Sequence, residues 1–289
     1  MWTIFADIGY WGSLVVLDST DFGLPQRRQR VFIVLLNANN LSITPTECVD
    51  LSQKILATTQ NFKKKAPGLC DFLLDNDDII VRQELARRKD QKEAPSKGGG
   101  GGAKEVGWPQ MHRDFLSKKG LTRGLVVTPP EIRASEWFST LGGREQECLG
   151  FAVRFSAEKG WNLSSVNLHP SINMIAFGRN NIAPTLVPGN LTWLFNPKGQ
   201  QGHTGDRLLL GHETLALQGY PVRDVLERAT SYTPSDVLLK DLGGNAFAMP
   251  IVQSIFVAIY INVKLPKQKN KLNIKNALAD MLHLMDDSD

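Results

Sequence analysis

The sequence contains few cysteines, and their spacing matches no metal or redox motif. Three occur among 289 residues, Cys48, Cys70 and Cys148, far apart and odd in number. A zinc ribbon or a redox dithiol requires closely spaced pairs, so neither is predicted, and the five histidines are equally scattered. Sparse, unpaired cysteine is typical of a reducing compartment. We therefore expect an intracellular protein, nuclear or cytoplasmic, that binds no metal.

Long apolar runs are also absent. No stretch approaches the roughly 18 consecutive apolar residues that a transmembrane helix needs. The first ten residues lack a basic start and include Asp7, which argues against a secretory signal. With 42% apolar and 21% charged residues, the composition is that of an ordinary globular protein.

The charge is only mildly positive overall but is concentrated in one region. The chain has 33 Lys and Arg against 29 Asp and Glu, a net charge of +4, which permits a nucleic-acid partner without requiring one. From Arg82 to Arg123, eleven basic residues stand against five acidic ones, a local net charge of +6. Two interpretations stay open: a solvated surface loop, or a contact with nucleic-acid phosphates.

Apolar patterning predicts a mixed α/β organisation. Two short strands, Leu14–Leu17 and Val31–Leu36, lie close enough in sequence for an antiparallel hairpin. Small strands and loops are predicted over 162–195, and five consecutive glycines at 98–102 predict a flexible loop. Helical patterns occupy 52–62, 76–88, 131–141, 144–158, 208–218, about 250–263 and, in the tail, 274–285.

Four sequence blocks form a recognisable series. They are Phe-Gly-Leu-Pro-Gln-Arg-Arg-Gln-Arg-Val-Phe at 22–32, Ala-Pro-Thr-Leu at 183–186, Glu-Thr-Leu-Ala-Leu-Gln-Gly-Tyr-Pro at 213–221 with Arg207 ahead of it, and Gly-Asn-Ala-Phe at 244–247 followed by Pro250. In this order and spacing, over roughly residues 1–263, the chain resembles the DNA cytosine-5 methyltransferases.

The resemblance implies a fold class and a domain plan. The fold would be α/β: the C-terminal part of an S-adenosylmethionine-dependent, Rossmann-like methyltransferase core with an inserted target-recognition domain. Residues 1–38 would belong to the catalytic core, 39–205 to the recognition insert, with a flexible loop near 94–105, and 206–263 to the core again. Residues 264–289 would form a basic and then acidic tail, partly helical.

The resemblance also implies roles in the first block. Arg30 matches the arginine that contacts the cytosine O2, and Arg28 matches the one that supports the active site. Gln26 would fix the turn, and Arg27 would lie on the surface. A fixed, permanently charged guanidinium suits contact with a flipped base on which charge develops. The alternative is that the whole block is a solvent-facing basic turn.

The remaining blocks match cofactor and structural positions. Gly244, Asn245 and Ala246 match residues that touch S-adenosylmethionine, and the alternative for Asn245 is an N-cap of the following helix. The other matched positions would hold the recognition region onto the core on the DNA side; they are Arg207, Glu213 and Gln218.

Several elements of the family pattern are missing. The family nucleophile is a cysteine in a Pro-Cys context, yet Cys48, Cys70 and Cys148 each follow a different residue. No Glu-Asn-Val and no Phe-x-Gly-x-Gly cofactor loop is present. The sequence thus predicts a C-terminal fragment that is inactive alone, with duplex DNA carrying a flipped cytosine and a missing N-terminal half as partners. Two alternatives are a non-catalytic DNA-binding or regulatory paralogue and a relative that methylates cytosine in transfer RNA.

Overall fold

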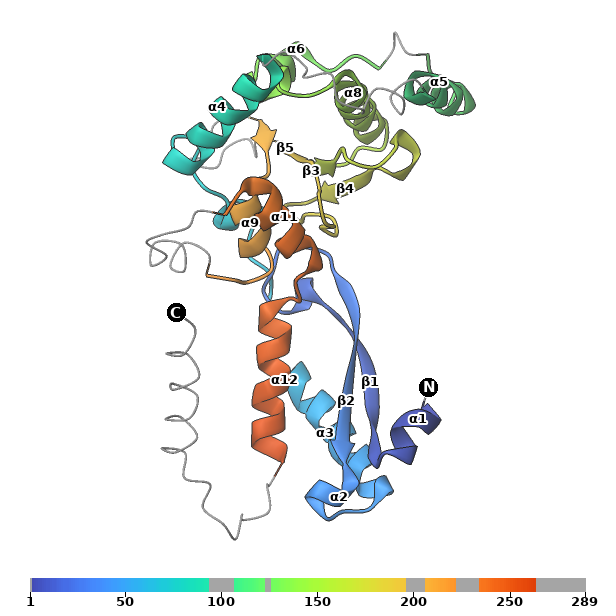
Figure 1. Ribbon diagram of the computed structural model, residues 1–289. Coiled ribbons are helices and arrows are strands. Elements are labelled where there is room, and N and C mark those ends of the chain that lie inside the picture. Colours follow the sequence, from blue (N-terminus) through green and yellow to red (C-terminus); the bar gives the residue numbers. More distant parts are fainter. Residues whose placement is uncertain (1, 94–106, 123–125, 196–205, 222–233, 264–289) are drawn as a thin grey trace, which may run out of the picture. The chain divides into compact units, whose positions relative to one another are not determined.

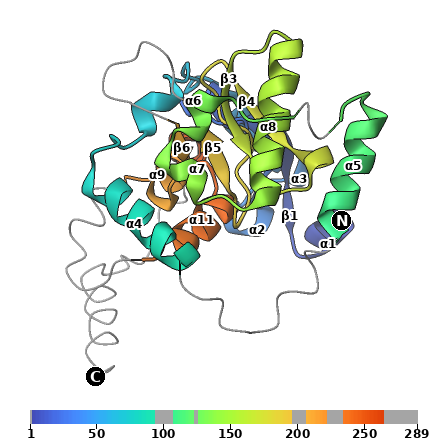
Figure 2. The same cartoon turned by 90° about the horizontal axis from the view of Figure 1, so that it is seen from above.

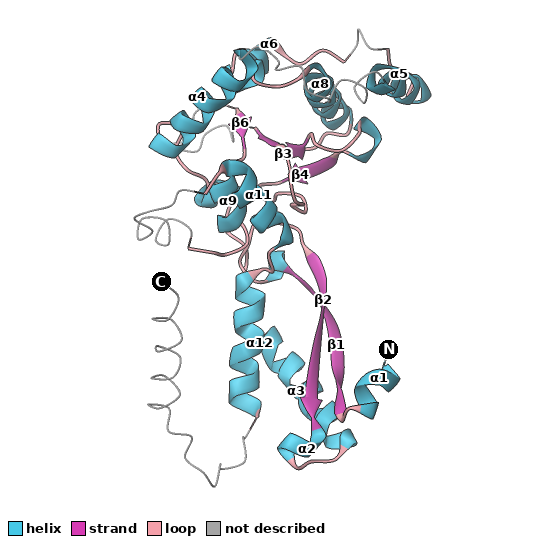
Figure 3. Ribbon diagram, viewed as in Figure 1, coloured by secondary structure: helices cyan, strands magenta, loops and turns pink. Residues whose placement is uncertain are grey.

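The computed structural model describes residues 2–93, 107–122, 126–195, 206–221 and 234–263 and is mixed α/β (Figures 1 and 3). The chain forms two compact units. Unit 1 comprises Met1–Val15, Val31–Asn61 and the chain from Ser254 onward, and unit 2 comprises Val16–Arg30 and Phe62–Gln253. The glycine run at 98–102 and the predicted tail helix lie outside the described residues.

Unit 1 is built on the predicted hairpin, which is confirmed. Strands β1 (Tyr10–Asp18) and β2 (Gln29–Asn37) pair as a two-stranded sheet, and both extend past the boundary between the units. Alternation along β2 buries Val34 and Leu36 and exposes Val31 and Ile33. The other elements of this unit are α1 (Trp2–Asp7), α2 (Ala38–Leu41), α3 (Pro45–Gln60) and most of α12 (Met249–Asn262).

Helices α3 and α12 supply the rest of the core of unit 1. Ile55 and Leu56 of α3 and Ala258 of α12 pack with the buried side chains of β2. Helix α3 begins seven residues before the predicted start, because Thr44 and Glu47 form a capping box: the Thr44 hydroxyl accepts from the Glu47 amide at 3.2 Å, and Glu47 accepts from the Thr44 amide at 2.7 Å.

Unit 2 contains a four-stranded antiparallel sheet in the order β4-β3-β5-β6. One row of the register runs from Phe177 through Val166 and Trp193 to Leu208, so a continuous apolar strip crosses all four strands. Helix α8 (Gly143–Glu158) lies along β3, and its apolar side chains share a core with this strip (Figure 2). The strands are β3 (Leu163–Asn167), β4 (Ala176–Arg179), β5 (Thr192–Leu194) and β6 (Arg207–Leu208).

The helices of unit 2 differ from prediction in three places. The pattern over 131–141 forms two short helices because Ser135 ends one and caps the next. The pattern over 208–218 begins as strand β6 and becomes helical only at Gly211. Helix α5 has no predicted counterpart.

Besides α8, the described helices of unit 2 are α4 (Ile79–Glu93), α5 (Trp108–Lys118), α6 (Pro130–Arg133), α7 (Glu136–Ser139), α9 (Gly211–Ala216) and α11 (Asp236–Asn245). Its 3₁₀ turns are η1 (Ser19–Asp21), η2 (Leu69–Phe72) and η5 (Ile172–Met174).

The described helices are short relative to the thickness of a membrane. None of them, taken singly, is both long and apolar enough to cross a bilayer. The pair α11 and α12 reaches that length and composition only when both are counted as one bent element.

A buried ion pair joins α9 to a distant segment of unit 2. Arg207 and Glu213 are almost fully buried and meet through two hydrogen bonds, of 2.6 and 2.8 Å. Arg207 also donates to the carbonyl of Leu74 and to the side chain of Asn76, both at 2.8 Å, while Glu213 accepts from the amides of Leu74 and Leu210. Every charge is therefore compensated, as a buried pair requires.

Removing one partner of this pair should be costly. We expect Glu213→Gln to lower the free energy of unfolding by about 3–5 kcal/mol, because it leaves Arg207 buried without a counter-ion. Glu158→Gln is the matched control, since Glu158 pairs with Arg154 at the surface and such pairs contribute about 0–1 kcal/mol. Urea denaturation followed by circular dichroism measures both. Equal losses in the two variants would show that the buried pair has no special role.

Candidate functional site

The Pro-Gln-Arg-Arg block lies in the loop from Ser19 to Arg28 that joins β1 and β2. The loop is closed at its base, where the Ser19 amide donates to the Arg28 carbonyl at 3.2 Å and the Ser19 hydroxyl donates to the Gln26 carbonyl. Gly23 takes a left-handed conformation, with φ of 84°. Gln26 is fully buried, which agrees with a residue that fixes the turn.

The Ala-Pro-Thr-Leu block lies against this loop. Gln26 and Ala183 form a parallel bridge, with the Arg27 amide donating to Ala183 at 3.0 Å and the Ala183 amide donating to Pro25 at 2.7 Å. The Thr185 hydroxyl donates to the Arg27 carbonyl at 2.7 Å. Two blocks more than 150 residues apart are thus joined through their backbones.

Arg28 connects the loop to two further segments. Its side chain is 4% exposed and donates to the carbonyl of Leu186 at 2.9 Å and to the carbonyl of Gly244 at 3.0 Å. Burial lowers the pKa of Arg28, and the nearby charge of Arg30 lowers it further. The first, second and fourth blocks therefore converge on one guanidinium, which excludes a solvent-facing turn at this residue.

Arg30 and Arg27 are placed differently from Arg28. Arg30 is partly exposed, and among the described residues its guanidinium donates only to the neighbouring carbonyl of Gln29, at 2.7 Å. Most of its donors are available for a ligand. Arg27 is exposed and is fixed only through its backbone. The structure thus separates the buried Arg28 from two accessible arginines.

The Gly-Asn-Ala block forms the end of α11. Gly244 is packed so closely that a Cβ atom would lie 2.2 Å from the Pro188 nitrogen. Asn245 is the last residue of α11, and α12 begins only at Met249, so the alternative that Asn245 caps the next helix is wrong. Its side chain is exposed, and Ala246 is partly exposed.

The Leu-Gln-Gly-Tyr-Pro block contacts the start of α12. Gln218 is fully buried, and its carbonyl accepts from the Met249 amide at 2.8 Å. Gly219 has φ of 83°, and a Cβ atom there would lie 2.6 Å from the ring of Pro250. With the buried pair of Arg207 and Glu213, this block holds α9, the 74–76 segment and the first turn of α12 together, all within unit 2.

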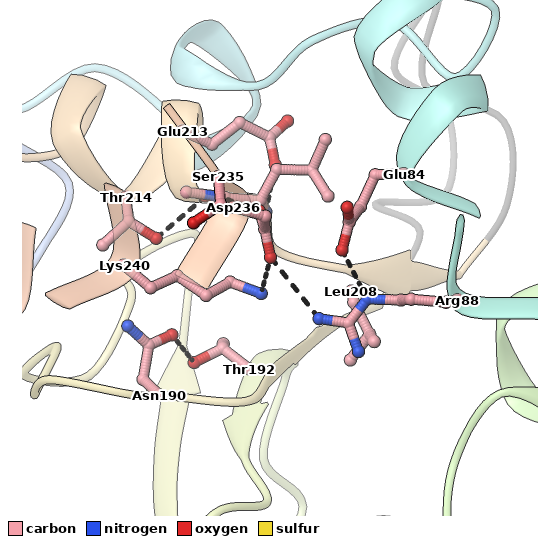
Figure 4. Close-up of polar contacts among 12 residues, drawn as sticks. Glu84, Arg88, Asn190, Thr192, Leu208, Glu213, Thr214, Ser235, Asp236 and Lys240 are labelled. Atoms are coloured by element: carbon pink, nitrogen blue, oxygen red, sulfur yellow. Dashed lines mark hydrogen bonds and ion pairs between the residues drawn. The ribbon is translucent and has the colours of Figure 1, made fainter. Parts of the chain in front are cut away.

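A second buried charge network was not apparent from the sequence (Figure 4). Asp236 pairs with Lys240 at 2.8 Å and with Arg88 at 3.4 Å, and Arg88 also binds Glu84 at 2.8 Å. Asp236 accepts from the Gly211 amide at 2.6 Å. Burial lowers the pKa of Lys240, and the partner Asp236 opposes this change. The network joins α4, α9 and α11.

This network changes the interpretation of the basic segment at 82–123. Several of its cations bind groups inside the protein: Arg87 and Arg88 bind Glu84, Lys89 binds Glu136, and Lys92 binds the carbonyls of Ser139 and Leu141. These side chains are not free for phosphates. Lys97, Lys104 and Arg123 lie outside the described residues.

The three cysteines are all buried, and none of them forms a disulfide. Burial raises the pKa of Cys48 and raises that of Cys148 to about 12. The Sγ atom of Cys148 lies 3.9 Å from Nε2 of His112, and Nδ1 of His112 lies 3.3 Å from Oε2 of Glu147. Cys148 and His112 have no exposed surface. A nucleophilic cysteine must be accessible and form a thiolate, so this Cys-His-Glu trio is part of the core.

The residues present fit part of a cofactor site. Proteins of the cytosine-5 family normally use S-adenosylmethionine, and the accessible amide of Asn245 can donate and accept hydrogen bonds toward such a molecule. Gly244 is buried, and its carbonyl already accepts a hydrogen bond from Arg28. Within the described ranges, no group of three or more His, Cys, Asp or Glu side chains is arranged for a metal ion.

Comparison with known proteins agrees with these blocks. Over 279 residues the chain is 25% identical to a DNA (cytosine-5-)-methyltransferase DMT5 of Cryptococcus neoformans var. grubii, covering 88% of this chain and 11% of that protein. It is 24% identical over 281 residues to the type II methyltransferases M.NgoBV of Neisseria gonorrhoeae and M.NlaIV of Neisseria lactamica, covering 86% of this chain and 63% of each.

The chain therefore spans less than two thirds of each of these relatives. A family model described as C-5 cytosine-specific DNA methylase matches residues 1–260, which include all four blocks. The chain belongs to the C-5 cytosine-specific DNA methylases.

Proposed function

We propose that this chain is the C-terminal core and target-recognition part of a DNA cytosine-5 methyltransferase, which acts only with a complementary segment that carries the Pro-Cys nucleophile. The observation that carries the proposal is the meeting of three family blocks at Arg28 in a chain whose cysteines are all buried. The complementary segment is defined by its chemistry, whether it is encoded on the same polypeptide or on another.

Unit 1 presents a surface suited to such a segment. The hairpin exposes Leu14, Val31 and Ile33 at 45–57%, and α12 exposes Phe256 at 66% and Tyr260 at 89%. A two-stranded sheet is marginal alone, and each of its strands pairs with one other strand in the described part of the chain. Exposed apolar side chains of this number favour a protein interface. A segment that adds strands to the hairpin would cover both features.

The arginines would have distinct roles in the assembled enzyme. Arg28 would hold the loop in place, because its two terminal guanidinium nitrogens already donate to the carbonyls of Leu186 and Gly244. Arg30, with available donors, would contact the O2 atom of the flipped cytosine and stabilise the charge that develops there. When bound, S-adenosylmethionine supplies the methyl group, and Asn245 and Ala246 would bind its amino-acid end.

The comparisons favour DNA over transfer RNA as the substrate. The family description and the name of the fungal relative both specify DNA, and neither names an RNA. Three buried cysteines without disulfides agree with an intracellular location, nuclear or cytoplasmic. A non-catalytic DNA-binding paralogue is the second candidate, since the same lack of an accessible cysteine supports it.

The isolated chain should transfer no methyl groups. A covalent adduct at C6 is needed to make C5 nucleophilic, and no described cysteine is accessible to form one. A radiolabelled methyl-donor assay with duplex DNA should give background counts, and fusion to a segment with the family Pro-Cys block should give turnover. Turnover by the chain alone, abolished by Cys48→Ser, Cys70→Ser or Cys148→Ser, would contradict this. Failure of every fusion would favour the paralogue.

In the reconstituted enzyme, Arg30→Ala should reduce turnover more than DNA affinity. Loss of one charged donor to a developing oxyanion lowers kcat about a hundredfold to a thousandfold, because the bond strengthens in the transition state. Arg27→Ala is the control, since Arg27 is exposed and fixed by its backbone. Single-turnover rates and duplex titrations separate the two effects. The role assigned to Arg30 is wrong if both substitutions reduce turnover equally.

A further inference from the structure

A groove in unit 2 lies beside the Ser19–Arg28 loop and has no role in the function proposed above. Its volume is about 1000 Å³. Three consecutive lysines, Lys63, Lys64 and Lys65, line it together with Thr20 and Asp21 of the loop and the segment 180–182. All three lysines are exposed.

The backbone around the groove is fixed by hydrogen bonds. Lys64 forms a parallel bridge with Phe22, and its amide donates to the Asp21 carbonyl at 2.7 Å. On the other side, the Leu69 amide donates to the Asn181 carbonyl at 3.0 Å. The lysine segment therefore lies along one side of the loop, while Ala183, next to the 180–182 segment, pairs with Gln26 of the same loop.

The charge of the groove is largely uncompensated. Lys63 pairs with Asp21 at 3.0 Å, but Lys64 and Lys65 have no ion pair with any described residue. This differs from the 82–123 segment, where Arg87, Arg88 and Lys89 bind carboxylates within the protein. Free lysines on an ordered backbone provide the charge that phosphate groups require.

Two asparagines add neutral hydrogen-bonding groups. Asn180 and Asn181 have φ of 55° and 61°, a left-handed conformation that persists only where the surroundings fix it. The Asn180 amide donates to the Asn162 carbonyl at 3.0 Å, which holds this turn. The side chain of Asn180 is exposed and makes no hydrogen bond with the described residues, so it can donate to an anionic oxygen.

We propose that this groove binds the phosphate backbone of DNA next to the target cytosine, with Lys64 and Lys65 as cationic contacts and Asn180 as a neutral one. The proposal rests on the proposed function, because the loop that borders the groove also leads to Arg30. The contacts are with phosphates and carry no sequence information. They would position the duplex while other parts of the recognition region read it.

The test is the salt dependence of duplex binding by the full chain. Fluorescence anisotropy titrations of a duplex at several salt concentrations give the slope of log K against log salt. For Lys64→Gln/Lys65→Gln we expect this slope to become shallower by about 2, roughly 1 for each lost phosphate contact, and equally for duplexes of different sequence. Asn180→Gly, which keeps the left-handed backbone, should weaken binding without changing the slope.

Lys54→Gln/Lys159→Gln is the matched control, since it removes two exposed lysines outside the groove. Circular dichroism checks that each variant is folded. An unchanged slope in the Lys64/Lys65 variant, or an equal change in the control, would overturn the groove assignment while DNA binding itself stands. Wild-type binding that is absent or independent of salt would also overturn the groove assignment, whereas the proposed function is tested separately, by the turnover of a fusion with a Pro-Cys segment. If the Lys64→Gln/Lys65→Gln variant lost more affinity for duplex RNA than for duplex DNA, the choice of DNA as the partner would be overturned.

Discussion

The buried guanidinium of Arg28 is the constraint on which the site depends. No described carboxylate pairs with it, so its desolvation is offset by the carbonyls of Leu186 and Gly244. Those carbonyls come from segments 158 and 216 residues away. Both hydrogen bonds form only when the loop, the Pro-Thr segment and the end of α11 are all in place. One side chain thereby connects the three family blocks.

The position of the Gly244 carbonyl depends in turn on the packing of α11 against α9. A Cβ atom at Gly243 would lie 2.5 Å from the Thr214 side chain, and one at Gly244 would meet the Val187–Pro188 backbone. Asp236 fixes the other end of α11 by accepting from the Gly211 amide and pairing with Lys240. Gly243 and Gly244 are thus required by close approach within the protein.

The sequence predicted the elements with strong periodicity and missed those that depend on distant partners. The β1–β2 hairpin, α8 and α12 followed from apolar patterns and from Pro250. The start of α3 could have been found from the Thr-x-x-Glu signature at Thr44–Glu47. Strand β6 could not have been found from the sequence, because Arg207–Leu208 is a strand only through pairing with Trp193 and Leu194. The partners of Arg28 are backbone carbonyls, which no side-chain pattern marks.

The same distinction explains why a count of charges along the sequence does not identify the cations that are available to a ligand. Summing charge along a sequence treats each cation as free, yet a helix with Glu84 on one turn and Arg87 and Arg88 on the next neutralises its own cations. Lys63–Lys65 form a shorter run with a smaller total, but among the described residues only Lys63 forms an ion pair, with Asp21. Charge available to a ligand depends on what the fold leaves unpaired. In this chain, Lys64 and Lys65 form no ion pair with any described residue and lie beside the loop that carries the buried Arg28, so the loop has a buried structural cation and exposed cations at its edge.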